Sequence, residues 1–316
     1  MKIILVTPAP AQIHTGNRTT ADRWARRLSE LGYEVAVQQD WNGEECDLLI
    51  ALHARRSFAS IQRFHEQRPR APLVLALTGT DIYRDVEKGA EARRSLDMAT
   101  KIVVLQELAF EAIPESSRAK ARVIYQSAES SATSLPREEG CFQVCVLAHL
   151  RAVKDPLRAA YAVRDLPASS RIVVKQAGAV LDPEFQEQVE AEQRMNPRYR
   201  WLGPLTHEKA MNLLACSHLL VLTSLLEGGA NVVSEAIAVN VPVISSRIPG
   251  SLGILGKDYP GYFPAGDTAA LRALLKRAES EEKFYRDMQQ RIAALRPLVS
   301  AAREREAWAA LLAELS

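Results

Sequence analysis

The sequence predicts an α/β fold in which two doubly wound parallel sheets face each other across a cleft. Short apolar runs alternate with amphipathic helical segments, and the alternation starts again after a polar, Ser-rich stretch. A length of 316 residues is also more than one core ordinarily holds, so two domains are expected. The predicted domains are 1–138 and 139–298, with the linker within Gln126–Gly140.

Each expected strand is a short apolar run between turn residues or helical segments. In the first half these strands are Lys2–Thr7, Tyr33–Val37, Asp47–Leu52, Pro72–Leu77, Lys101–Leu105 and Arg122–Ile124, with helices at about Arg18–Leu31 and Phe58–Gln67. In the second half they are Phe142–Ala148, Arg171–Lys175, Tyr199–Trp201, His218–Thr223 and Val241–Ser245, followed by amphipathic helices at Thr268–Ala278, Glu281–Leu295 and Val299–Leu315. Ligands of such sheets bind outside the carboxyl ends of the strands, so functional residues should follow strands.

Composition limits the classes of partner and the compartment. Apolar residues make up 47% and charged residues 25% of the chain, and the net charge is only +2, so neither nucleic acid nor membrane is an expected partner. The amino end has no signal-peptide core, and the four cysteines form no metal pattern, so we expect a cytoplasmic protein with reduced core thiols. The amphipathic carboxyl-terminal helices fit packing within the chain or against a second copy, so a homo-oligomer remains open.

The segment 221–250, VLTSLLEGGANVVSEAIAVNVPVISSRIPG, reads as strand, glycine loop, helix and strand. The glycines Gly228 and Gly229 allow backbone angles and close ligand approach that side chains forbid, and Asn240 supplies a helix end. A loop that leads into a helix presents N–H groups suited to phosphate. Glu227 and Glu235 flank that position and suit hydroxyl groups better than phosphate. The pattern indicates a nucleotide sugar, although an ordinary turn with two surface glutamates has the same spacing.

The spacing Glu-x7-Glu, followed by EA and VPVI, resembles the donor-site signature of the retaining glycosyltransferase family 4, which has the GT-B fold. The resemblance implies that the first Glu contacts the sugar hydroxyls, that the loop amides hold the diphosphate and that the second Glu binds the ribose. It also implies that the terminal helix, about 299–316, crosses back to the first domain. The donor residues implied in this way are Glu227, Gly228, Gly229, Ala230, Asn231 and Glu235.

The second domain opens with VLAHLRAVKDP, which is similar to the family pattern G-R-L-x-x-x-K-G. Lys154 matches the Lys, Ala148 and His149 replace the Gly and Arg, and Arg151 is a substitute for the missing Arg. Fixed cations and loop amides stabilise a departing diphosphate without metal. Because the sequence has no Asp-x-Asp motif, we predict a metal-independent enzyme without cofactor, although a solvated basic loop is the alternative. The family also implies a nucleobase site at Trp201, Leu202, Gly203 and Leu205, where Trp201 suits a core position better than stacking.

The first domain is expected to bind the acceptor. HTGNRTT places Gly16 at the family's flexible glycine loop, which implies that Gly16 contacts the donor. LTGTD resembles the family's H-G-T-D segment, with Thr78 in place of the active-site His. Guanidinium groups near a helix amino end suit a phosphate-type oxyanion. Arg18 is therefore predicted to be catalytic together with Lys154 and Glu227, whereas a surface role is expected for Arg56. The predicted acceptor residues are Asn17, Arg18, Thr19, His53, Arg55, Thr78, Gly79 and Thr80.

Phrases in both halves, among them TGNRTTADRWARRLSELGYEV, IALHARRSFASI, LVLALTGTDIYRD and SRIPGSLGILGKDYPGYFP, resemble the selenosugar synthases of selenoneine biosynthesis over roughly Met1–Asp267. The resemblance implies that selenophosphate attacks UDP-N-acetylglucosamine or UDP-glucose, giving a 1-selenosugar, UDP and phosphate. Selenophosphate needs no general base, which is consistent with Thr78 in place of His.

Two other functions remain open at this point. One is a conventional glycosyltransferase that uses a UDP-sugar and an alcohol or thiol acceptor. The other is a UDP-sugar-binding protein without transferase activity. The residues do not separate selenophosphate from thiophosphate, and they leave retention or inversion of configuration open.

Overall fold

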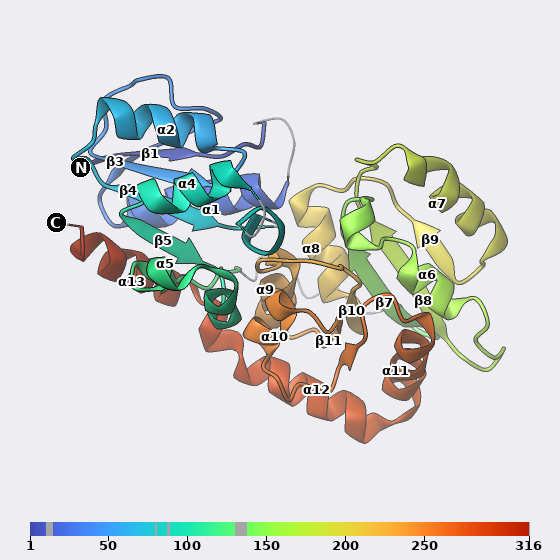
Figure 1. Ribbon diagram of the computed structural model, residues 1–316. Helices are drawn as coiled ribbons and strands as arrows, with labels where there is room; N and C mark the ends of the chain where they lie inside the picture. The colour runs from blue at the N-terminus through green and yellow to red at the C-terminus, as the bar shows by residue number, and fades with distance from the viewer. Residues whose placement is uncertain (11–14, 80, 87–88, 130–137, 316) are drawn as a thin grey trace. The chain divides into compact units, whose positions relative to one another are not determined.

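The computed structural model describes residues 1–10, 15–79, 81–86, 89–129 and 138–315, and it shows the predicted α/β fold with two parallel sheets. The chain forms two compact units, and Figure 1 labels many of their helices and strands. The first comprises Met1–Ser127, Glu227–Asn231 and Leu298–Ser316, and the second comprises Ala128–Leu226 and Val232–Pro297. Residues 130–137 of the predicted linker lie outside the described ranges.

The first unit is built on a six-stranded parallel sheet in the order β2-β1-β3-β4-β5-β6. Its strands are β1 (Lys2–Val6), β2 (Glu34–Gln38), β3 (Leu48–Leu52), β4 (Leu73–Leu77), β5 (Lys101–Val104) and β6 (Ala121–Val123). Its helices are α1 (Gly16–Glu30), α2 (Phe58–Gln67), α4 (Ala90–Met98), α5 (Glu115–Arg118) and α13 (Ala301–Ala313), with a π-helical turn at Asp81–Asp85 and a 3₁₀ turn at Glu107–Ala112.

Alternating side chains of the strands build a core on each face of this sheet. On β1, Ile3 and Leu5 pack with residues of α1 and α13, whereas Ile4 and Val6 pack with residues of α2 and α4. Trp24 of α1 and Trp308 of α13 meet edge to face, with ring centroids 4.9 Å apart. The last helix of the chain, red in Figure 1, is therefore part of the first unit's core.

The second unit has a six-stranded parallel sheet in the order β12-β11-β10-β7-β8-β9. Its strands are β7 (Phe142–Leu147), β8 (Ile172–Ala177), β9 (Tyr199–Trp201), β10 (Leu219–Leu222), β11 (Val243–Ser246) and β12 (Tyr262–Phe263). Its helices are α6 (Arg158–Val163), α7 (Glu184–Met195), α8 (His207–Ala215), α9 (Asn231–Ala238), α10 (Pro249–Leu255), α11 (Thr268–Ser280) and α12 (Glu282–Ala294). A 3₁₀ turn, Arg296–Val299, follows α12.

The predicted helix end at Asn240 is confirmed, and the structure shows that Asn240 has a left-handed φ of 57°. All four cysteines are free thiols, but Cys141 and Cys216 are only half-buried, so the prediction of four core thiols was wrong for these two. Burial raises the pKa of Cys145 to about 12, which keeps that thiol protonated and unreactive. Within the described ranges, no helix is long and apolar enough to cross a membrane.

Each sheet has one point at which the strand order reverses. It lies between β1 and β3 in the first unit and between β7 and β10 in the second. At such a switch point the two connections leave toward opposite faces, which opens a crevice at the carboxyl ends of the two strands. The predicted acceptor residues follow β1, β3 and β4, and the predicted diphosphate residues follow β7 and β10.

Candidate active site

Two loops meet at the carboxyl ends of β7 and β10. The loop after β7 ends in a short 3₁₀ turn that contains Lys154, and Asp155 closes it with a left-handed φ of 44°. The hydroxyl of Thr223, just after β10, donates to the Lys154 carbonyl at 2.8 Å, and the Leu225 N–H donates to the Val153 carbonyl at 2.9 Å. These two bonds hold the Lys154 turn against the segment that leads to Glu227.

Arg151, the predicted substitute for the missing Arg, has a carboxylate neighbour. Its Nε lies 3.9 Å from Asp182 Oδ1, and the other oxygen of Asp182 accepts from the Ala152 N–H at 2.8 Å. The Arg151 side chain is 40% exposed. An ion pair this open to water contributes little to stability.

The predicted nucleobase loop is bonded to the end of β8. The indole N–H of Trp201 donates to the Gly178 carbonyl at 3.0 Å, and the Leu202 N–H donates to the Gln176 carbonyl at 2.8 Å. Gly203 has a φ of 69°, and its carbonyl accepts from the Gly178 N–H at 2.9 Å. These bonds hold the half-buried Trp201 and its loop against the end of β8. Leu205, later in the same loop, is also half-buried.

Glu235 lies one turn into α9 and is mostly buried, with 16% of its side chain exposed. Its Oε1 is 3.9 Å from Nδ1 of His207, the first residue of α8. The predicted ribose carboxylate therefore lies beside the helix that follows the nucleobase loop. Sequence reasoning missed His207, because nothing in the sequence links a helix start to a carboxylate 28 positions later.

The glycine loop, Glu227–Asn231, is counted with the first unit. Glu227 is buried, with 9% exposed. Neither Gly228 nor Gly229 has a positive φ, so the expectation that the loop needs glycine for its backbone angles was wrong. Close approach to the chain itself explains them: an added Cβ would lie 3.0 Å from the Thr78 carbonyl at Gly228 and 2.7 Å from Leu105 Cβ at Gly229.

The side chain of Asn231 joins this loop to the start of α1. Its Nδ2 lies 3.3 Å from both the Gly16 carbonyl and the Thr20 hydroxyl. Its Oδ1 accepts from Arg23 Nη1 at 2.8 Å. The structure thus brings together Gly16 and the glycine loop, which the sequence had placed in one donor site, and it adds Arg23, which the sequence had not indicated. Ala230 is buried and does not take part in these bonds.

The acceptor-side residues at the start of α1 bond to one another and to carboxylates. Asn17 Oδ1 accepts from the Thr78 hydroxyl at 2.8 Å. Arg18 Nε lies 3.0 Å from Asp22, and Arg55 Nε lies 3.1 Å from Asp85. Both predicted cations therefore already face a carboxylate that sequence reasoning overlooked. Thr19 is half-buried and donates its N–H to the Thr15 carbonyl at 2.9 Å, and Thr80 lies outside the described residues.

Asp81 forms hydrogen bonds to the loop after β3 and to the loop after β4, which carry predicted acceptor residues. From the sequence, Asp81 was given no role. Its carboxylate is completely buried. One oxygen accepts from the Ala54 N–H at 3.0 Å, after β3, and the other accepts from the Gly79 N–H at 2.9 Å, after β4. The segment quoted as LTGTD therefore ends in a residue that fixes the geometry of both loops.

The side chain of His53 is buried rather than open to solvent. It is 3% exposed and has a left-handed φ of 76°, and its Nδ1 accepts from the Arg56 N–H at 3.3 Å. Burial lowers the pKa of the imidazole below its usual 6.5, and the carboxylates of Asp81 and Asp85 only partly oppose this. His53 is therefore neutral at pH 7, with its proton on Nε2.

We predict that His53 makes the protein less stable in mild acid. The pKa of His53 is lower in the folded chain than in the unfolded chain, so below about pH 6.5 the unfolded chain binds more protons at this residue. The free energy of unfolding therefore falls as the pH falls. His53→Asn removes the titration, and Asn tolerates the left-handed backbone. Urea denaturation at pH 7.0 and 5.5 should show a larger loss for the wild type than for His53→Asn. Equal losses would contradict the assignment.

We expect Gly229→Ala to destabilise the first unit by about 1–3 kcal/mol, as overpacking of a filled core does. The added methyl would lie 2.7 Å from Leu105 Cβ, and Leu105 is itself only 1% exposed. Gly16→Ala is the matched control, because its nearest neighbour, Asn231 Nδ2, is at 3.7 Å. Thermal unfolding should separate the two variants, and equal melting temperatures would show that the loop has room to move.

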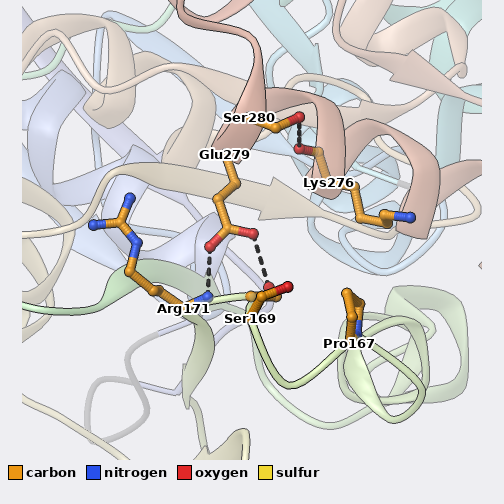
Figure 2. A pocket seen from close by; sticks show the side chains of 7 residues that line it. Pro167, Ser169, Arg171, Lys276, Glu279 and Ser280 are labelled. Carbon is orange, nitrogen blue, oxygen red and sulfur yellow. Dashed lines mark hydrogen bonds between the residues drawn. The ribbon is translucent and has the colours of Figure 1, made fainter.

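Figure 2 shows a pocket of about 330 Å³ in the second unit. Glu279 of α11 accepts there from the Arg171 N–H at 2.5 Å and the Ser170 hydroxyl at 2.8 Å. Arg171 precedes β8, so this pocket lies at the amino ends of the strands and contains none of the predicted residues. Among the described residues, no group of three His, Cys, Asp or Glu side chains is arranged to hold a metal ion.

The family model of glycosyl transferases group 1 matches residues 128–294. A Xenopus tropicalis protein called glycosyltransferase 1 domain-containing protein 1 is 25% identical over 288 residues, covering 83% of each chain.

Solved structures give the same result for the fold. Anabaena HepE in complex with UDP-glucose has a TM-score of 0.79 at 14% identity, covering 99% of this chain and 100% of HepE. Sucrose-phosphate synthase from Thermosynechococcus elongatus has a TM-score of 0.73 at 15% identity, covering 99% of each chain. At sequence identities this low, structural similarity is evidence about the fold alone. The TM-scores confirm the predicted GT-B fold.

Proposed function

This chain belongs to the glycosyl transferases of group 1, and from that premise we propose that it transfers a hexosyl group from a UDP-sugar to selenophosphate. The donor is UDP-N-acetylglucosamine or UDP-glucose, and the products are a 1-selenosugar, UDP and phosphate. The reaction needs neither metal nor cofactor. The free cysteines suit a reducing compartment, the cytoplasm.

One observation carries the donor half of the proposal. Lys154 follows β7 and the glycine loop follows β10, and these two strands flank the switch point. Two hydrogen bonds join the segment after β7 to the segment after β10. In this proposal Lys154 and the loop amides neutralise the diphosphate, Glu227 holds sugar hydroxyls and Glu235 binds the ribose. HepE, which shares this fold, binds UDP-glucose in its crystal, which supports a UDP-sugar as donor.

The acceptor half rests on the polar groups at the start of α1. Arg18, Asn17 and Thr78 lie around the amino end of a 15-residue helix, whose first N–H groups favour an anion. Selenium of selenophosphate attacks the anomeric carbon, and the bond from that carbon to the UDP oxygen breaks, leaving its electron pair on the diphosphate. Water then cleaves the selenium–phosphorus bond and releases phosphate.

A conventional transferase with an alcohol or thiol acceptor is the second candidate. The pairing of Arg18 with Asp22 and of Arg55 with Asp85 favours it, because these carboxylates offset the positive charge that a phosphate group would need. Both pairs include a partly exposed side chain, however, and such pairs exchange partners at low cost.

The test is an anaerobic incubation with UDP-N-acetylglucosamine, with and without selenophosphate, followed by mass spectrometry. UDP release that depends on selenophosphate, together with a product carrying the selenium isotope pattern, would establish the reaction. UDP release with an alcohol or thiol but not with selenophosphate would favour the second candidate. If UDP bound but neither UDP-N-acetylglucosamine nor UDP-glucose was consumed with any acceptor, the proposal would fail.

Two variants separate donor from acceptor roles. We expect Glu235→Ala to weaken UDP binding by about tenfold, since it removes a charge-assisted bond to the ribose. Arg18→Ala should leave UDP binding unchanged and lower turnover with selenophosphate. Calorimetric titration with UDP and steady-state UDP release measure the two effects. Unchanged UDP affinity in Glu235→Ala, or unchanged turnover in Arg18→Ala, would remove that residue from the site.

A further inference from the structure

A buried carboxylate on the last helix is linked to the glycine loop through α1. Glu304, in the first turn of α13, is 1% exposed. Its Oε1 accepts from Trp24 Nε1 at 3.0 Å and from Arg23 Nε at 3.1 Å, and its Oε2 accepts from the hydroxyl of Ser127. A carboxylate buried this deeply remains stable only when several donors satisfy it.

Arg23 extends this network to the loop. While its Nε binds Glu304, its Nη1 donates to Asn231 Oδ1 at 2.8 Å. The Arg23 side chain is only 12% exposed, and its Nη2 is buried without a hydrogen-bond partner among the described residues. Arg23 therefore depends on Glu304 for charge compensation, and its planar guanidinium holds both partners in one fixed geometry.

We propose that Glu304 and Arg23 are positioning residues that hold the glycine loop, Glu227–Asn231, in the conformation that binds the nucleotide sugar. The inference rests on the proposed function, because that function assigns the donor to this loop. Asn231 is the first residue of α9, so fixing its side chain also fixes the N–H groups at the start of that helix. The last helix of the chain thereby acts on donor binding without touching the donor.

Arg23→Met and Glu304→Gln test the inference. Arg23→Met keeps the bulk of the stem and removes both hydrogen bonds, and Glu304→Gln keeps the shape and removes the charge. Arg305→Ala is the matched control, since it removes an exposed 3.3 Å contact from α13 to Glu30 of α1. We expect KM for the UDP-sugar and Kd for UDP to rise about tenfold in the first two variants, the cost of a charge-assisted bond, with kcat within about twofold of wild type.

Amide hydrogen exchange of peptides covering 225–238 gives a readout that does not depend on activity. Faster exchange in Arg23→Met and Glu304→Gln, but not in Arg305→Ala, would support the positioning role even if the proposed donor or acceptor were wrong. A lower melting temperature with unchanged loop exchange and unchanged UDP affinity would show a purely structural role and overturn the inference. If Glu304→Gln does not fold, Arg23→Met decides alone.

Discussion

Lys154→Ala is expected to lower kcat/KM for the UDP-sugar roughly 100-fold, the usual cost of removing one fixed group that stabilises developing charge. The cation is expected to act on the departing diphosphate. The turn that carries it is held by main-chain and Thr223 bonds, which do not involve the side-chain ammonium. The substitution should therefore remove the charge and leave these two bonds in place. The measurement is steady-state UDP release with the donor and acceptor that turn over.

Lys154→Arg and Lys276→Ala are the controls for this experiment. Arg keeps the positive charge and should recover part of the rate. Lys276 lines the pocket of Figure 2 at the other end of the sheet, so its loss should leave the rate unchanged. A rate for Lys154→Ala within about threefold of wild type would exclude Lys154 from charge stabilisation.

Asp81→Ala is expected to destabilise the first unit by about 3 kcal/mol, because it leaves one buried and one half-buried backbone N–H group without an acceptor. Those groups belong to Ala54 and Gly79, so the loops after β3 and β4 should also separate. Three tryptophans, Trp24, Trp41 and Trp308, lie in the first unit. Their fluorescence in urea therefore reports mainly on this unit.

Asp22→Ala is the control for Asp81→Ala. Asp22 carries a single bond to Arg18 and is 44% exposed, so its loss should change the free energy of unfolding by less than about 1 kcal/mol. If Asp81→Ala were as mild as Asp22→Ala, the loops would be held by their own turns rather than by the shared carboxylate.

The fold was predictable because its signals are local. Fully apolar strands such as Leu48–Leu52 and Leu73–Leu77 are buried at every position and stand out from the amphipathic helices between them. The elements for which the sequence analysis gave no range include the strand Tyr262–Phe263 and the helix Pro249–Leu255. The strand has two residues, too few for alternation to show, and the helix carries two glycines, which argue against a helix in the sequence.

The site was predictable only where residues follow one another closely along the chain. Glu227 and Glu235 share one loop and helix, and Lys154 follows a strand, so spacing and resemblance pointed to them. The assignments of function to these residues remain predictions. Other residues near the site bond to residues that are distant in the sequence. Asp81 accepts a hydrogen bond from a residue 27 positions earlier, and Glu304 bonds to Arg23 across 281 positions. No local pattern marks such pairs, because folding alone brings them together.

The placement of α13 determines when the first unit can complete its folding during synthesis. Trp24 packs against Trp308, and residues up to Leu312 close the same core, so the face of α1 has no cover until the last part of the chain has been made. At roughly 5–20 residues per second, the ribosome needs many seconds to add the residues between Ser127 and that helix. During this interval the nascent first unit exposes an aromatic surface, and its completion depends on a contact of very long sequence separation. We therefore expect this arrangement to make the chain depend on chaperones during synthesis.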